Sequence, residues 1–291
     1  MSVYQNLMSK IDNAGLLFNV ESHEVQTAGG IAIPNKRAII NTSNNAVMSV
    51  VSDTYKVVPN EEIYSAFCKS IEASEIDTTD AMVNVKQTAT GSRAMVDFVF
   101  PAHQITVAKD SSPTSLQICA LNSFDGSTRY MTKAGGLRMK CLNGQILGDV
   151  VGAYSHCHTK SLDVDMGAAV VCQMVQEFQN ASEYWGAMMK RRVNKATAIE
   201  CIYKFLNCKL DEHGKPVRED NERLVHCLNL HNSYARELGH NAYALYNVFT
   251  DYITHYQPRS ADPAKRQMSV RSKGAKAIAA LPVFAELQQA A

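Results

Sequence analysis

The residues best suited to metal chemistry lie in the segment Tyr154–Lys160, which places two histidines around one cysteine. On an extended strand His156 and His158 would face the same side, and imidazole pairs can hold zinc or iron. Cys141 and His226 are the residues that could complete such a site. No C-x-x-C or H-x-x-x-H element accompanies the two histidines. A metal-dependent enzyme is therefore the weakest of three functional hypotheses.

Nucleophilic and cofactor chemistry have less support. Cys157 cannot pair with either flanking histidine on a strand, because adjacent residues point to opposite faces. The sequence contains no G-x-S-x-G, P-loop or G-x-G-x-x-G motif. We expect no enzymatic activity and no cofactor.

Polyanion binding is the chemistry that the cations favour. No acidic residue occurs between Asp125 and Asp149, and several lysines and arginines fall in or near that interval. Two further basic groups follow, one near residue 190 and one in the segment 257–276. Phe124 and Tyr130 could stack on unpaired bases, although packing across a hairpin is the alternative for each. The predicted phosphate contacts are Arg129, Lys133, Arg138, Lys140, Lys190, Arg191 and Arg192.

The elements that must position these cations form a predicted meander over residues 121–143. Asp125-Gly126 is a strong signal for a type I′ hairpin turn, and Ala134–Gly136 supplies a second turn. In the strand that would follow, Leu137, Met139 and Cys141 alternate with two cations. Arg138 and Lys140 are thereby predicted to point outward.

The rest of the chain divides into strands and then helices. Paired strands are predicted at 37–40 with 46–51, and at 81–88 with 93–100, where Pro101 ends the hairpin. A helix capped by Asn60 runs to about Ala73. Apolar spacings of three and four then predict helices over 170–189, 199–206, 224–239 and 245–256. This order indicates an α+β fold: an N-terminal antiparallel β-meander sheet with one helix, followed by a mostly helical half.

The two regions, 1–160 and 161–291 with its basic C-terminal segment, are expected to form one continuous unit. The chain has 291 residues, 46% of them hydrophobic, and a formal net charge of +1. Any polyanion site must therefore come from local clustering.

The eight cysteines lack paired spacing, which is typical of a reduced, cytoplasmic protein. The sequence shows no signal peptide and no membrane span. The apolar stripe around Trp185 favours a homo-oligomer, with an intramolecular contact as the alternative.

Several short segments are R37-A-I-I, V51-S-D-T-Y-K-V-V-P-N-E-E, N122-S-F-D-G-S, R138-M-K-C-L-N-G, H158-T-K-S and Y246-N-V-F-T-D-Y with H255. In this order they resemble a family of phage- and plasmid-like proteins classed as a domain of unknown function, number nine-three-two. The order and spacing agree from about residue 37 to 281. The resemblance implies a mobile-element setting and carries no known activity. A weaker analogy of fold links the chain to phage single-strand annealing proteins, which place a twisted meander beside helices.

The leading hypothesis is a phage-encoded single-stranded DNA-binding protein that anneals strands in replication or recombination. The alternative is a non-catalytic interaction protein, such as a virion component or an inhibitor of a host defence system.

Overall fold

The computed structural model describes residues 1–74, 76–140, 143–146, 154–213, 217, 221–256, 273–274 and 276–289. Its larger sheet has six antiparallel strands in the order β4-β5-β6-β7-β8, with β9 paired to β7. Alternate residues of the central strands are apolar and face the helices, which creates the main core. The strands are β4 (Met82–Gln87), β5 (Arg93–Ile105), β6 (Thr114–Ser123), β7 (Tyr130–Arg138), β8 (Asn143–Ile146) and β9 (Tyr154–His156).

The turn predicted at Ala134–Gly136 is wrong, because β7 continues through it. Gly136 pairs with Leu116 of β6. A Cβ at Gly136 would overlap the side chains of Thr114 and Trp185. The glycine is therefore needed for close packing between the sheet and a helix, and the chain reverses only after Arg138.

Pro101 does not end the preceding hairpin, contrary to the prediction. Strand β5 runs on to Ile105, and its register with β6 shifts between Phe100 and Gln104. A bulge of this kind tolerates a proline, which cannot donate a ladder hydrogen bond. The hairpin of β4 and β5 itself is confirmed.

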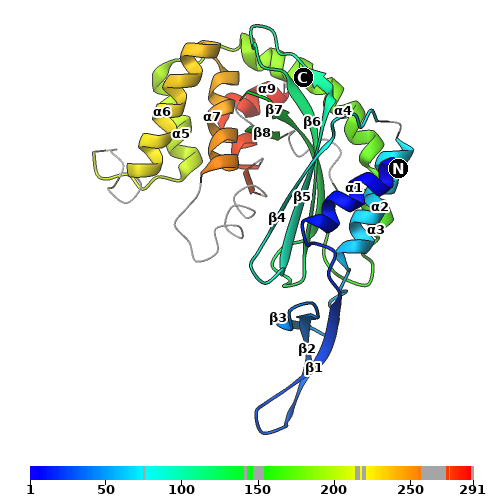
Figure 1. Ribbon diagram of the computed structural model, residues 1–291. Helices are drawn as coiled ribbons and strands as arrows, with labels where there is room; N and C mark the ends of the chain where they lie inside the picture. Colours follow the sequence, from blue (N-terminus) through cyan, green and yellow to red (C-terminus); the bar gives the residue numbers. More distant parts are fainter. Residues whose placement is uncertain are drawn as a thin grey trace.

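Four helices cover one face of the larger sheet (Figure 1). The predicted long helix is confirmed as α4, and its Trp185 is completely buried against the sheet. Trp185 therefore makes the intramolecular contact that was the alternative to a subunit interface. The four helices are α1 (Val3–Asn13), α2 (Asn60–Ala73), α3 (Val164–Ala169) and α4 (Val171–Lys190).

A smaller antiparallel sheet of three strands projects from this body (Figure 1). The predicted pairing across residues 42–45 is confirmed between its second and third strands. Its inner side chains, Ile39, Met48 and Val51, pack around Phe124 from the turn after β6. The strands are β1 (Val20–Gln26), β2 (Ala32–Asn41) and β3 (Ala46–Ser52).

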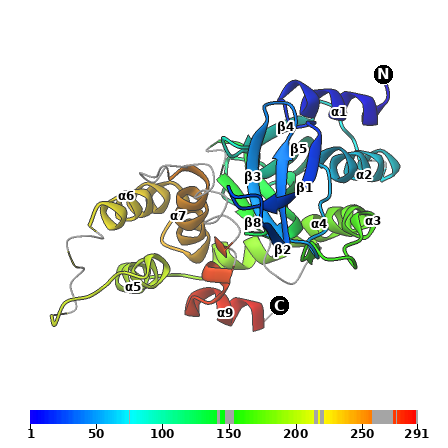
Figure 2. The ribbon, with the colours of Figure 1, turned by 90° about the horizontal axis from the view of Figure 1, so that it is seen from below.

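The remaining helices lie beside the sheet, as Figure 2 shows from below. The α+β fold class, with strands first and helices later, is confirmed. The predicted basic segment 257–276 lies outside the described residues except for 273, 274 and 276. Within the described ranges no helix is long and apolar enough to cross a membrane. The helices of this part are α5 (Lys195–Leu206), α6 (Asn221–Leu238), α7 (Ala242–His255) and α9 (Pro282–Gln289).

Candidate nucleic-acid interface

Arg138 is completely buried, so the prediction that its side chain points outward is wrong. Its Nε donates to Asp110 Oδ2 and its Nη2 to Asp110 Oδ1, both at 2.7 Å. Nη2 also donates to Glu237 of α6 at 2.7 Å. A bidentate guanidinium–carboxylate pair of this kind fixes the orientation of both partners. Arg138 therefore serves as a structural anchor and has no open face for a phosphate.

Three parts of the chain meet around Arg138. We call the side chains that join them the arginine cluster: Asp110, Arg138, Lys140 and Glu237. Asp110 lies in the loop between β5 and β6, and it also accepts from the hydroxyl of Tyr243 on α7 at 3.3 Å. Lys140 is exposed and donates to Glu237 at 2.9 Å. Partial burial raises the pKa of the Glu237 carboxyl, but hydrogen bonds and charge interactions with Lys140 and Arg138 together hold it below its usual range. The cluster thus fixes the β5–β6 loop and α6 against the end of β7.

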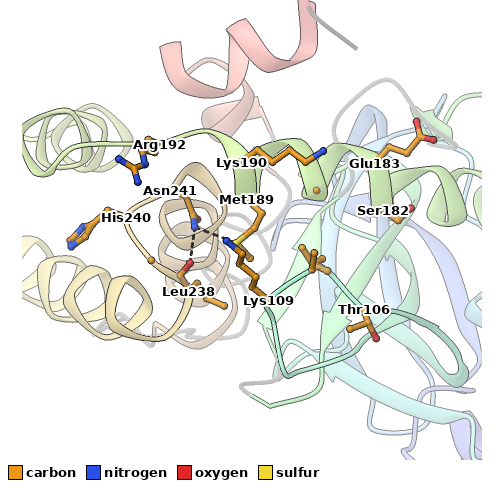
Figure 3. A pocket seen from close by; sticks show the side chains of 14 residues that line it. Thr106, Lys109, Ser182, Glu183, Met189, Lys190, Arg192, Leu238, His240 and Asn241 are labelled. Carbon is orange, nitrogen blue, oxygen red and sulfur yellow. Dashed lines mark hydrogen bonds between the residues drawn. The ribbon is translucent and has the colours of Figure 1, made fainter.

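A hollow of about 920 Å³ is lined by residues that adjoin the arginine cluster in sequence, Lys109 before Asp110 and Leu238 after Glu237. Figure 3 shows its lining side chains. One wall is the loop that contains Lys109, and a second is the end of α4 with Lys190 and Arg192. The third wall is the connection between α6 and α7, where His240 lies. We call this hollow the basic groove, because Glu183 is the one acidic side chain among its described lining residues.

The position of Lys109 is unusual for a lysine. Its φ is +71°, in the left-handed region that side chains other than glycine rarely adopt. The turn is closed by the N–H of Asp110 donating to the carbonyl oxygen of Val107 at 2.9 Å. The buried Asp110 carboxylate is held by Arg138, so the cluster maintains the strained backbone that carries Lys109 to the groove.

The third wall is also fixed by hydrogen bonds. Asn241 caps α7 through its Oδ1, which accepts from the N–H of Ala244 at 2.9 Å. Its Nδ2 donates to the carbonyl oxygen of Leu238 at 2.7 Å (Figure 3). Arg192 pairs with Asn241 through a β-bridge. The segment that follows α4 is thereby attached to the α6–α7 connection.

The other predicted phosphate contacts do not form one face. Arg191 is exposed and paired with Glu286 of α9. Lys133 is partly buried on the side of the larger sheet opposite to the helices, whereas Arg129 is exposed near the smaller sheet. Of the predicted cations, the structure brings together Lys190 and Arg192. Sequence analysis did not assign Lys109 or His240 to a site, because only the fold places them beside α4.

Phe124 and Tyr130 are both completely buried, so neither presents a ring face for base stacking. Phe124 fills the core of the smaller sheet. Tyr130 packs under Gly167 of α3 and edge-on to Tyr154. The packing alternative is therefore the one that the structure supports.

A second polar network connects segments that carry the family resemblance. The Asn122 amide donates to Asn60 Oδ1 at 2.9 Å and to the carbonyl oxygen of Val58 at 3.1 Å. His158 Nε2 donates to Asn122 Oδ1 at 2.9 Å, and its ring stacks on Tyr55 at 5.0 Å between centroids. Asn60 is thus a buried partner in this network. It is not the helix cap that the sequence predicted, since Pro59 occupies that position.

The Asp125-Gly126 turn lies at the edge of this network. Gly126 has a φ of +66°, but Asp125 does not have a positive φ. The Asp125 carboxylate accepts from the N–H of Ser127 at 3.0 Å, which forms an Asx turn instead of the predicted type I′ turn. Arg93 lies 3.5 Å from the same carboxylate.

The structure gives the two histidines proposed for a metal other partners. His158 is buried and committed to Asn122, and burial lowers its pKa to about 4. His156 Nδ1 lies 2.7 Å from the carbonyl oxygen of Cys157. His226 lies on α6 beside Tyr252 and Tyr256, and Cys141 lies outside the described residues. Among the residues described, no three candidate ligands lie close enough to hold an ion.

Comparison with known proteins gives one match. The family model described as "Domain of unknown function (DUF932)" matches residues 47–280. No curated protein and no solved structure matches the chain. The matched region contains both the basic groove and the Asn122 network.

Proposed function

The chain belongs to the DUF932 family, and from that premise we propose that it binds single-stranded DNA through the basic groove. A phage origin, a cytoplasmic location and a role in strand annealing during replication or recombination are parts of the same proposal. The observation that carries it is the convergence of Lys109, Lys190 and Arg192 from two separate segments around one hollow.

The charge of the groove suits a phosphate backbone. All three side chains are exposed, and no described residue forms an ion pair with Lys190 or Arg192. The net charge of the chain is only +1, so the attraction must be local. Arg192 can bind a phosphate with two hydrogen bonds, whereas the lysines act as point charges. Such contacts position a strand without reading its sequence.

The proposal predicts a measurable salt dependence. Each phosphate that is neutralised on a single strand lowers log K by about 0.7 per unit of log salt concentration. Three contacts would therefore weaken binding roughly 100-fold over a tenfold rise in salt. Fluorescence anisotropy of a labelled oligonucleotide across a salt series measures this slope directly, and the matching RNA oligonucleotide tests strand preference.

The decisive variant is Lys190→Glu/Arg192→Glu. It should abolish detectable binding at moderate salt, because it places two negative charges beside the phosphates. The matched control is Lys36→Glu/Lys69→Glu, which makes the same change in net charge at exposed sites on β2 and α2. Equal losses in the two double variants, or no binding by the wild-type chain at low salt, would refute the proposal.

The smaller sheet favours a second candidate function, that of a non-catalytic protein-interaction factor. Val47 and Val50 of β3 are 58% and 52% exposed, and Ile31 is 71% exposed near the start of β2. Exposed apolar side chains gathered on one projecting element are typical of a protein contact. Capture of one defined virion or host protein by the wild-type chain, and its loss with Val47→Thr/Val50→Thr, would favour this function.

A further inference from the structure

A second hollow, which we call the junction pocket, has chemistry that the basic groove does not use. It has a volume of about 400 Å³ and lies between the end of β3, the β6–β7 turn and the segment after β9. Its walls contain Arg129 together with the hydroxyl groups of Thr54, Ser127, Thr128 and Thr159. The described lining residues include no carboxylate.

The cation of the junction pocket has no direct counter-ion among the described residues, although the charge of Asp125 reaches His158 and Tyr55 in the pocket wall. Arg129 is exposed and has no ion pair or hydrogen bond with any residue that the structure describes. The nearest acid in the sequence, Asp125, is occupied by Ser127 and Arg93. A guanidinium without a counter-ion at the mouth of a polar pocket favours an anionic ligand.

The hydroxyl groups supply donors for the rest of such a ligand. The Oγ1 atom of Thr128 is buried and has no hydrogen-bond partner among the described residues. A buried polar atom without a partner costs free energy that a ligand can recover. Thr159 Oγ1 lies 3.0 Å from Ser161 Oγ, and when Ser161 donates, the Thr159 proton is left for a ligand.

The remaining wall is uncharged at neutral pH. Burial lowers the pKa of His158 to about 4 and raises the pKa of Tyr55 to about 12. The stacked pair of rings therefore presents neither a competing negative charge nor a second cation. The ligand must be recognised by one guanidinium and by the hydroxyl groups of Thr128 and Thr159, because Ser127 Oγ already donates to Asp125.

We propose that the junction pocket binds the phosphoryl group of a phosphomonoester, with Arg129 and Thr128 donating to its oxygens. A tetrahedral oxyanion accepts hydrogen bonds in several directions, which matches donors from two segments of the chain, the β6–β7 turn and the segment after β9. The volume leaves space for the sugar that carries the phosphate. The source is either a free nucleoside monophosphate or the terminal phosphate of a nucleic acid strand.

Titration calorimetry with inorganic phosphate and with adenosine 5′-monophosphate tests the site itself. Arg129→Gln should weaken both ligands at least tenfold, and Arg129→Lys should restore part of the affinity. Thr128→Val keeps the shape of the side chain and removes its hydroxyl, so it should also weaken binding. Lys69→Gln is the control that should change nothing. An absence of binding by the wild-type chain, or equal binding by Arg129→Gln, would overturn the proposal.

The source of the phosphate is decided by oligonucleotides with and without a 5′-phosphate. If the terminal phosphate is the natural ligand, the phosphorylated strand binds at least fivefold tighter, and Arg129→Gln removes the difference. A free monophosphate as ligand gives no such difference while calorimetric binding persists. Calorimetry with inorganic phosphate on Lys190→Glu/Arg192→Glu separates the pocket from the groove, because phosphate binding at the pocket should persist when strand binding by the groove is lost.

Discussion

The guanidinium of Arg138 lies between the carboxylates of Asp110 and Glu237 and is shielded from water. Removal of one partner from a buried ion pair leaves the other charge without compensation. Arg138→Met should therefore lower the free energy of unfolding by about 3 to 5 kcal/mol. Chemical denaturation measures the loss. Lys140→Met is the control, because this exposed partner of Glu237 should cost less than about 1 kcal/mol.

A double variant tests the cause of that loss. Asp110→Asn/Arg138→Met removes both buried charges, so it should cost less than the sum of the single variants. Additive losses would contradict a direct interaction. If the cluster also positions the groove, the double variant should bind single-stranded DNA more weakly than Lys140→Met does at the same salt concentration.

His158 should make stability depend on pH. Its pKa is about 4 in the folded chain and about 6.5 when unfolded, so the unfolded chain binds more protons between these values. Stability is complete above pH 6.5 and falls as the pH drops toward 4. Between pH 7 and pH 5 the contribution lost is about 2 kcal/mol. His158→Gln keeps a donor toward Asn122 and should show a smaller loss over that interval in denaturation curves. An unchanged pH dependence would exclude His158 as its source.

These residue pairings could not be read from the sequence. Arg138 meets a partner 28 residues earlier and another 99 residues later. The absence of acidic residues near Arg138 in the sequence predicts a free cation. The fold, however, brings Asp110 and Glu237 into contact with it. The local patterns were informative only where the interaction is also local.

At the scale of elements, α4 is held against β7 by the absence of a side chain at Gly136. Gly136→Ala should destabilise the protein by about 1 to 3 kcal/mol, because the added methyl group overlaps Trp185 and Thr114. Gly186 provides the matched control within α4, since an added Cβ there meets no atom within 4 Å. Gly186→Ala should raise stability by about 0.5 to 1 kcal/mol. Thermal unfolding of both variants distinguishes packing at this position from a general effect of glycine replacement.

The elements were largely predictable because their signals are periodic. The helices α4, α5, α6 and α7 follow from apolar residues at spacings of three and four. The strand that contains Gly135-Gly136 was mistaken for a turn, since consecutive glycines usually mark one. Gly136 is needed because Trp185 of α4 packs against it, and no local sequence pattern reveals this contact. Helix α1 and strand β1 are not among the predicted elements. Helix α1 nevertheless carries a local signal, since Val3, Leu7 and Ile11 recur at a spacing of four and Ser2 forms a capping box with Gln5.

At the scale of the whole molecule, the smaller sheet leaves apolar side chains in contact with water. We expect the chain to associate with itself through this surface and not through α4, whose Trp185 is buried. Light scattering should show a mass that rises with concentration, and Val47→Thr/Val50→Thr should reduce it while retaining β-forming residues. A monomer at all concentrations would contradict self-association. The exposed apolar surface would then be the contact for a different protein.

Nor could the candidate site be predicted as a whole. Lys190 and Arg192 are close in sequence and can be recognised as one basic group, but their neighbour Lys109 belongs to a loop that reaches α4 only in the folded chain. The residues that line a groove depend on which loops lie together in the folded chain. That arrangement is set by the long-range contacts of the whole fold.

The Asn122 network also has a consequence for the order in which the protein forms during synthesis. Asn122 binds Asn60 and His158, and Lys56 donates to the carbonyl oxygen of Leu162, 106 residues later. While the ribosome still holds residues 158–162, Asn122 lacks His158 and Lys56 lacks the carbonyl oxygen of Leu162. The bond between Asn122 and Asn60 can form earlier, so the network is completed only after the start of the helical half has been synthesised.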